Sequence, residues 1–342
     1  MLTIKSDERK WLEDLKEFVS RWNASAGDEY LGDNPFSKFV FIAKADNWVD
    51  FTQWHESLKG SWGFRGQRSS EWFLHSSLDR AVEVSGAGLN FSFVTHVDRK
   101  ATEDRLLFKF RQRAHQYLRH QPDDHDLISW LALMQHHGVP TRLLDWTRSP
   151  YVAAYFAFEA QAAEPCAIWA VDLDWLKRRG SRLLQSARKG LIPDNLSVRA
   201  KYLNNLLSEP EDPDEDPAKN AMIIEVEPAR TDAWMTSQQG FFLCKRYPRA
   251  TFNQLLMSMM LHPELVEVPT VRKLELGADL RIEFLKKLRS ANIHRGSLFP
   301  DLDGFSQFLR MDWEIDRDDI RQQMENPTEP PQDDLDESVT IE

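Results

Sequence analysis

Apolar residues recur every three or four positions in several segments, and this spacing predicts amphipathic helices. The first covers residues 7–22, where one stripe is formed by Trp11, Leu12, Leu15, Phe18, Val19 and Trp22. Further helices are predicted over residues 48–58, 99–119 and 127–134, the first of them capped by Asp46 or Asn47. The face of the 99–119 helix that lacks apolar residues carries Arg105, Lys109, Arg111, Arg113 and Arg119.

Short runs rich in β-branched and aromatic residues lie between these helices and predict strands. They cover residues 61–67, 142–146, 167–171, 222–226 and 241–244. Because strands and helices alternate irregularly, the pattern favours an α+β fold over a doubly wound parallel sheet.

Segments of low apolar content divide the chain. Residues 208–217 hold three prolines and six acidic residues, which predicts an exposed loop. We expect a helical accessory region over residues 1–58, a main domain over 59–312 that contains this loop, and an acidic, disordered tail over 313–342.

The net charge of −11 is concentrated near the C-terminus. Residues 311–342 include twelve acidic and two basic residues, whereas the other 310 residues carry 42 acidic and 41 basic ones. The main body is therefore close to neutral and gives no global support for nucleic-acid binding, although a local basic groove stays possible.

The cysteines and the hydropathy of the chain are used to predict its cellular compartment. Cys166 and Cys244 lie in apolar runs and are expected to be buried, reduced thiols, with no spacing typical of a metal site. The first ten residues are polar, and no apolar run approaches about 18 residues. We therefore expect a cytoplasmic protein without a signal peptide or a membrane span.

The passage over residues 131–159 gathers hydrogen-bonding side chains between two apolar runs, as loops that carry chemistry do. Either His136 or His137 is a candidate general acid or base. Arg142 is a candidate ligand-binding residue. No further metal-ligand spacing accompanies the histidines, so no metal is predicted.

After the two histidines, residues 145–150 combine a predicted strand end with the N-terminus of a predicted helix. Such an arrangement favours the binding of anionic groups. Thr147 and Ser149 add hydroxyl donors, Trp146 adds a stacking face, and Asp145 is a candidate catalytic carboxylate. Helix capping by Ser149 is the simpler alternative for that residue.

Arg65 is the candidate at an earlier strand. Because Gly66 follows it, another group can approach the backbone closely, and a guanidinium there can hold a phosphate or carboxylate by two contacts. Gln67 is a candidate ligand contact beside it. The alternative is a structural pairing of Arg65 with Asp145 or Glu71. A late glutamine, Gln239, can contact a ligand, position water or serve a turn.

Four motifs resemble those of the FRG domain, a bacterial family named for a Phe-Arg-Gly motif. The first stands here as Phe64-Arg65-Gly66. The second runs from Gln135 to Thr147 and continues through Ser149-Pro150 and an alanine-rich helix. The third and fourth resemble residues 239–242 and 297–304. Together they cover about residues 62–310 in the expected order, so the chain resembles this family strongly.

A looser resemblance is to the ADP-ribosyltransferase fold, a split sheet that is mixed and mostly antiparallel, with surrounding helices. That resemblance implies that Arg65 grips NAD, that residues 145–157 shape the nicotinamide-ribose pocket, and that Gln239 assists transfer. The chain has Gln239 where the commonest pattern has Glu, so Asp145 is the alternative source of negative charge.

Three functional hypotheses follow. The first is an ADP-ribosyltransferase-like or NAD-cleaving, nucleotide-binding enzyme that acts as a bacterial toxin or phage-defence effector, with NAD as the candidate substrate. The second is a non-catalytic ligand-sensing or protein-interaction module that uses the N-terminal helices or the acidic tail. The third is an RNA- or DNA-directed protein that uses the basic helix over residues 99–119.

Overall fold

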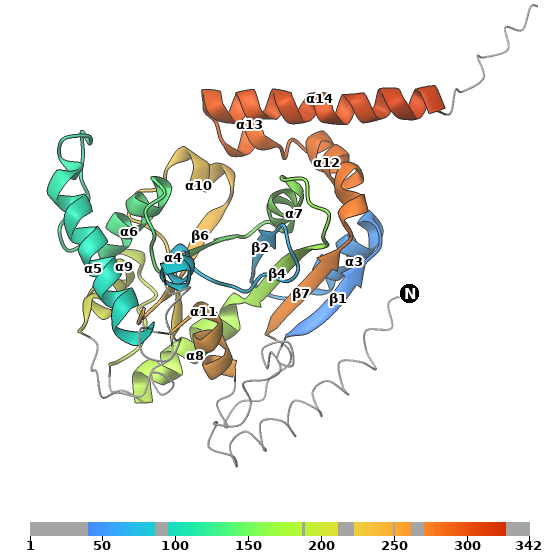
Figure 1. The fold of residues 1–342 in the computed structure, drawn as a ribbon. Coiled ribbons are helices and arrows are strands. Elements are labelled where there is room, and N and C mark those ends of the chain that lie inside the picture. Colours follow the sequence, from blue (N-terminus) through green and yellow to red (C-terminus); the bar gives the residue numbers. More distant parts are fainter. Residues whose placement is uncertain are drawn as a thin grey trace, which may run out of the picture.

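The computed structural model describes residues 40–85, 95–186, 189–210, 222–248, 250–260 and 270–325. The helix predicted over residues 7–22, most of the acidic loop and residues 326–342 of the acidic tail lie outside these ranges. Within them, helices surround a single seven-stranded sheet (Figure 1). None of the helices in these ranges has both the length and the apolar character that a membrane span needs.

The strand order is β1-β7-β4-β2-β3-β6-β5. Only β1 and β7 pair in parallel, and the other neighbours are antiparallel. The predicted α+β fold with a mixed, mostly antiparallel sheet is confirmed. The strands are β1 (Phe41–Ala45), β2 (Trp62–Gln67), β3 (Leu143–Thr147), β4 (Cys166–Asp172), β5 (Ile223–Val226), β6 (Gly240–Lys245) and β7 (Val271–Leu276).

The sheet is weakest between β2 and β3. β2 pairs with β4 along all six of its residues, and β3 pairs with β6 along all five of its own. The pairing of β2 with β3 is limited to Phe64 opposite Thr147. The two strands therefore diverge beyond this pair, and the gap lies between residues 65–67 of β2 and 143–146 of β3.

The helices predicted over residues 48–58, 99–119 and 127–134 are present with shifted ends, and several more surround the sheet. α5 begins four residues before the predicted start at Arg99 and ends at Ala114. The helices are α3 (Trp48–Ser57), α4 (Ser77–Ser85), α5 (Thr95–Ala114), α6 (Leu127–His136), α7 (Pro150–Phe158), α8 (Leu173–Ser186), α9 (Leu196–Ser208), α10 (Ala233–Ser237), α11 (Phe252–Met260), α12 (Arg281–Ser290), α13 (Arg295–Leu298), α14 (Leu302–Glu325) and a 3-10 turn, η1 (Ala278–Leu280).

Side-chain caps start two of the predicted helices. The Asn47 side chain accepts a hydrogen bond from the amide of Asp50 at the start of α3. Ser149 does the same for the amide of Val152 at the start of α7, with Pro150 at the first helical position. α3 also packs into the same core as α7, so the described end of the predicted accessory region adjoins the main sheet. The predicted boundaries stay predictions.

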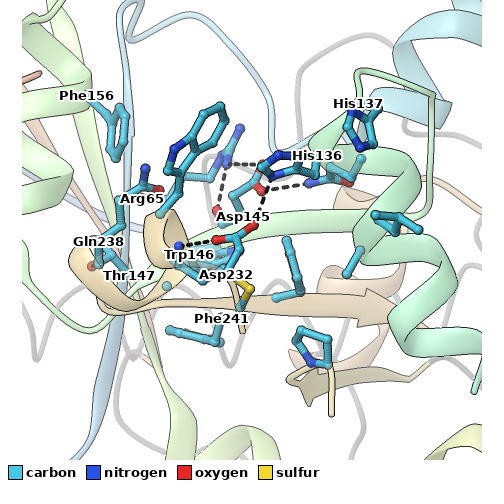
Figure 2. Close-up of a pocket in the computed structure, with 18 of the residues that line it drawn as sticks. Arg65, His136, His137, Asp145, Trp146, Thr147, Phe156, Asp232, Gln238 and Phe241 are labelled. Atoms are coloured by element: carbon cyan, nitrogen blue, oxygen red, sulfur yellow. Dashed lines mark hydrogen bonds and ion pairs between the residues drawn. The ribbon is translucent and has the colours of Figure 1, made fainter. Parts of the chain in front are cut away.

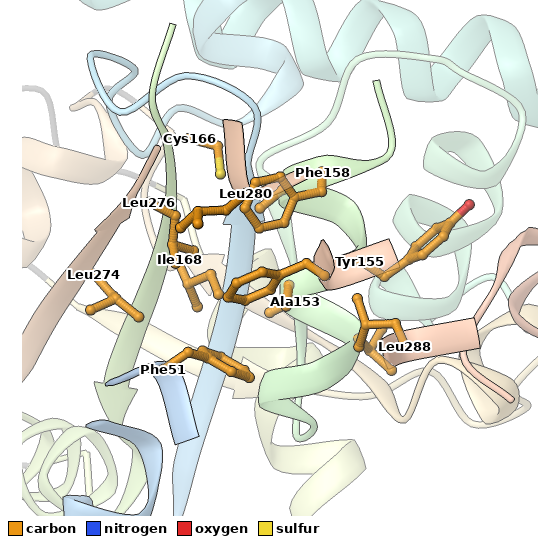
Figure 3. Close-up of a cluster of buried hydrophobic side chains, with 14 of the residues drawn as sticks. Phe51, Ala153, Tyr155, Phe158, Cys166, Ile168, Leu274, Leu276, Leu280 and Leu288 are labelled. Atoms are coloured by element: carbon orange, nitrogen blue, oxygen red, sulfur yellow. The ribbon is translucent and has the colours of Figure 1, made fainter. Parts of the chain in front are cut away.

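The core around α7 explains the Phe-Arg-Gly motif. α7 lies on the sheet, and its buried alanines face β2 and β4 (Figure 3). A Cβ atom at Gly66 would lie 1.9 Å from the carbonyl oxygen of Ala153 and 2.6 Å from the amide nitrogen of Ala157. The close approach that the sequence predicts at Gly66 is therefore made by a helix backbone and not by a ligand.

We predict that Gly66→Ala lowers the free energy of unfolding by more than about 3 kcal/mol, because a methyl group would overlap helix backbone that cannot rotate away. Gly180, inside α8, is the matched control, since a Cβ there meets nothing closer than 3.9 Å. Gly180→Ala should stabilise by up to about 1 kcal/mol. Urea denaturation measures both. Equal urea midpoints for the two variants would contradict the close contact between Gly66 and the backbone of α7.

Candidate functional site

A cavity of about 1540 Å³ opens where β2 and β3 diverge (Figure 2). β2, β3, the end of α6, the start of α10 and the segment after β2 all contribute to its wall. Its volume exceeds the range of about 300–1,000 Å³ that is usual for small-molecule sites, so it can hold an extended ligand. The weak point of the sheet and this cavity therefore coincide.

Arg65 reaches across the gap from β2 to β3. Its Nη1 donates a 2.6 Å hydrogen bond to the carbonyl oxygen of Asp145 and lies 3.7 Å from the Asp145 carboxylate. Its Nε is buried and has no hydrogen-bond partner among the described residues. Burial lowers the pKa of Arg65 from its usual value, Asp145 opposes that shift, and Arg80 adds to it. The structure thus holds a partly satisfied cation in the cavity.

Asp145 is the one exposed residue of β3, and its side chain is 64% accessible. Its Oδ1 accepts a 2.7 Å hydrogen bond from Nε2 of Gln135. The Thr141 hydroxyl donates in turn to Oε1 of Gln135, which fixes the orientation of that amide. The carboxylate is therefore held in place from one side and open to solvent or a ligand on the other.

His136, at the end of α6, lines the same cavity as Asp145. Its Nδ1 lies 2.9 Å from Oδ2 of Asp232, and its ring centroid lies 4.5 Å from that of Trp234, with the two rings tilted by 37°. Asp232 also caps α10 by accepting from the amide of Met235. His137 lines the same cavity and ends α6. Of the two predicted histidines, His136 is the one with a carboxylate partner that can orient its ring.

Aromatic rings continue the wall on this side. Trp234 meets Phe299 at 5.1 Å, and Phe299 meets Phe156 at 6.1 Å, both in edge-on contacts. Arg295 covers another face of Phe299 at 3.6 Å. This run of rings comes from α10, α7 and the turn after α13, and it gives the cavity an aromatic, apolar side.

Several predicted ligand residues have structural roles as well, and Trp146 and Thr147 still contribute to the cavity wall. Trp146 is 3% exposed and packs in the apolar cluster that includes Leu144 and Phe241. Alternation along β3 explains this, since neighbours of Asp145 point to the opposite face. Thr147 donates to the carbonyl of Gln238 and accepts from the amide of Ser149, which itself caps α7.

Gln67 and Arg142 are buried in hydrogen-bonded positions. Gln67 donates to the carbonyl of Phe73 and accepts from the indole of Trp169. Arg142 is 2% exposed, pairs with Glu103 of α5, and donates to the carbonyl of Arg246. Gln67 contributes to the cavity wall, with its amide nitrogen and its amide oxygen each hydrogen-bonded within the fold, and Arg142 does not line the cavity.

The late glutamine at the cavity is Gln238, one residue before the predicted Gln239. Gln239 has a left-handed backbone (φ 48°), and its exposed side chain lies outside the cavity wall. Gln238 lines the cavity and donates from Nε2 to the carbonyl of Leu298. A left-handed residue between α10 and β6 reverses the chain direction, which turns Gln238 inward and Gln239 outward.

Sequence reasoning did not find Asp232, Trp234, Phe156 and Phe299 as site residues. A signal for Asp232 exists, because Asp followed two residues later by Trp in a short polar stretch suits a helix cap. The aromatic residues carry no such signal, since buried rings are common in any core. Among the described residues, no three histidine, cysteine or acidic side chains gather as a metal site would require.

We predict different stability effects for two neighbours on β2. Gln67→Leu should lower the free energy of unfolding by about 1–3 kcal/mol, because it removes the hydrogen bonds that Gln67 makes with the Trp169 indole and the Phe73 carbonyl. Arg65→Ala should cost less than about 1 kcal/mol, because its carboxylate partner is largely exposed. Urea denaturation compares them. A larger loss for Arg65→Ala would show that Arg65 is chiefly structural.

Comparison with known proteins supports one assignment. Residues 60–165, from the start of β2 to the turn before β4, match the family model described as the FRG domain. No curated protein and no solved structure gives a significant match. The matched segment carries Arg65, Gln135, His136 and Asp145, which meet at the cavity. The chain thus contains an FRG domain, with its Phe-Arg-Gly motif at the gap between β2 and β3.

Proposed function

We propose that the cavity binds NAD or a closely related nucleotide and cleaves its nicotinamide–ribose bond, with transfer of ADP-ribose to an acceptor or to water. The observation that carries this proposal is the pairing of Arg65 with Asp145 at the gap in the sheet. It places a partly satisfied cation and an exposed carboxylate side by side in one large cavity. NAD needs both, a cation for its diphosphate and a negative charge near its ribose.

Arg65 suits the diphosphate. A guanidinium binds phosphate oxygens through two parallel donors, and the buried Nε of Arg65 has no partner in the described structure. Its Nη1 is already held by the carbonyl of Asp145, so the group is positioned before a ligand arrives. Arginine remains charged even when burial lowers its pKa, so the cation persists in the empty cavity.

The aromatic side of the cavity suits the nicotinamide ring. Phe156, Phe299 and Trp234 form a continuous run beside His136. Flat heteroaromatic rings stack on such surfaces in offset or edge-on contacts worth about 0.5–1.5 kcal/mol each. A ring seated there would exclude water from the bond that breaks.

Asp145 and His136 would carry the chemistry. When the bond from ribose C1 to the nicotinamide nitrogen breaks, the electron pair leaves with nicotinamide and positive charge develops on the ribose. The Asp145 carboxylate, held by Gln135, can stabilise that charge. The acceptor hydroxyl or water then bonds to C1 and loses its proton, which we assign to His136, oriented by Asp232.

The proposal also includes a cellular location and a biological role. The enzyme would act in the bacterial cytoplasm, as a toxin or as a defence effector that consumes or transfers ADP-ribose. The order of Arg65, the β3–α7 block and Gln238 along the chain, which resembles the order of the corresponding motifs in ADP-ribosyltransferases, supports the proposal. Gln238 now takes the place that the sequence suggested for Gln239.

NAD or ADP-ribose should raise the melting temperature of the protein, because a ligand bound only by the folded state stabilises it by mass action. At a hundred times the Kd the gain is about 2.7 kcal/mol. Arg65→Ala should abolish the shift. Arg182→Ala, an exposed arginine on α8, is the matched control and should retain it. The melting temperature is also measured with NADP, ATP and GTP. No shift with any nucleotide would contradict the proposal and favour a non-catalytic interaction module.

Asp145→Asn should slow nicotinamide release by about 100-fold, because the amide keeps the shape of the carboxylate but cannot neutralise the developing charge. Asparagine can still accept from Gln135, so the fold and the NAD-dependent melting shift should be preserved. Chromatographic detection of nicotinamide under single-turnover conditions measures the rate. A variant as fast as wild type would remove Asp145 from the mechanism.

A further inference from the structure

The tract over residues 105–122 differs in charge from the rest of the chain. It holds Arg105, Lys109, Arg111, Arg113 and Arg119 together with two histidines, and it contains no acidic residue. The whole chain, by contrast, carries a net charge of −11. Such a local excess of positive charge is a candidate surface for a polyanion.

Three of these cations form one row on α5. Arg105, Lys109 and Arg113 are all exposed and follow one another at intervals of four residues. Residues at this spacing share one face of a helix, about 6 Å apart along its axis. Asp104 at the start of the row is paired with Lys100, and Glu103 is buried against Arg142. The row therefore keeps its positive charge.

Exposed aromatic rings accompany the row. Phe108 on α5 is 68% exposed, and Tyr117 just beyond the helix is 81% exposed. The buried side of α5 is supplied by other residues, since Leu106, Leu107 and Phe110 pack against the apolar cluster that includes α6. Phe108 and Tyr117 are thus not needed to hold α5 in place.

The tract leads from the side of the molecule to the cavity. α5 runs along the outer flank and its C-terminal end lies near α6 (Figure 1). The residues that follow, His120, Gln121 and Pro122, line the cavity wall. Two further exposed rings, Trp72 (45%) and Phe73 (42%), line the same cavity, and Arg68 lies over the Trp72 ring at 4.8 Å.

We propose that this surface binds single-stranded nucleic acid, with the phosphate backbone along Arg105, Lys109, Arg113 and Arg119 and a base stacked on Trp72 or Phe73. Cations track the backbone, and exposed rings stack on bases whose faces are free, which occurs only where bases are unpaired. The alternation of cations and exposed rings therefore favours a single strand over a duplex. The binding surface itself does not depend on NAD.

Fluorescence anisotropy with labelled 20-nucleotide single-stranded DNA and RNA tests the surface, with the full chain and without NAD. The triple variant Lys109→Ala, Arg113→Ala, Arg119→Ala removes three exposed cations. The control variant Lys44→Ala, Arg182→Ala, Lys201→Ala changes the net charge equally at exposed positions elsewhere. The first should bind at least tenfold more weakly, with a slope of log K against log salt shallower by about 2. The control should match wild type.

Trp72→Ala separates stacking from charge. It should weaken single-strand binding about tenfold and leave the salt slope unchanged, because stacking on one base is worth about 1–3 kcal/mol. The proposal is overturned by absence of binding at low salt or by equal losses in the two triple variants. Equal affinity for a duplex, for poly-glutamate or for anionic vesicles would also overturn it. Because NAD is absent, none of these outcomes bears on NAD binding.

Discussion

The contact between the β2 backbone at Gly66 and the α7 backbone at Ala153 and Ala157 is the constraint on which the rest of the structure depends. No side chain separates the two elements at this point, so the helix lies closer to the strand than ordinary packing allows. α7 follows β3 directly after the Ser149 cap, so the same contact fixes where β3 ends relative to β2. Side-chain packing of the alanine-rich helix then builds the core on that face of the sheet.

The gap in the sheet follows from this arrangement and creates the site. β2 and β3 meet only at Phe64 and Thr147, so neighbouring backbone groups are free to serve a side chain or a ligand. Arg65 uses one of them, the carbonyl of Asp145. The neighbouring polar groups are oriented in pairs, Asp145 by Gln135 and His136 by Asp232. A polar floor and an aromatic side therefore face one volume, which is the combination that a dinucleotide requires.

Short-range sequence patterns predicted those features of the fold that depend on short-range interactions. The caps Asn47 and Ser149, the five strands β2 to β6 and the α+β class depend on short-range patterns, and the structure confirms them. The strands β1 and β7 were not predicted, because their pairing joins residues more than 200 positions apart. Arg142 was misplaced for the same reason, since its partner Glu103 lies on a separate helix. The left-handed backbone at Gln239 reversed the roles of two adjacent glutamines, and nothing in a Gln-Gln-Gly sequence specifies which of them adopts it.

A crystal structure of the protein with ADP-ribose at saturating concentration tests the central claim most directly. We predict that the diphosphate lies within hydrogen-bond distance of the Arg65 guanidinium, including its Nε, and that the terminal ribose lies beside the Asp145 carboxylate. The position that nicotinamide would occupy should lie against Phe156, Phe299 or Trp234. Density for the ligand at a different surface, or an empty cavity at saturation, would contradict the claim that the gap between β2 and β3 is the nucleotide site.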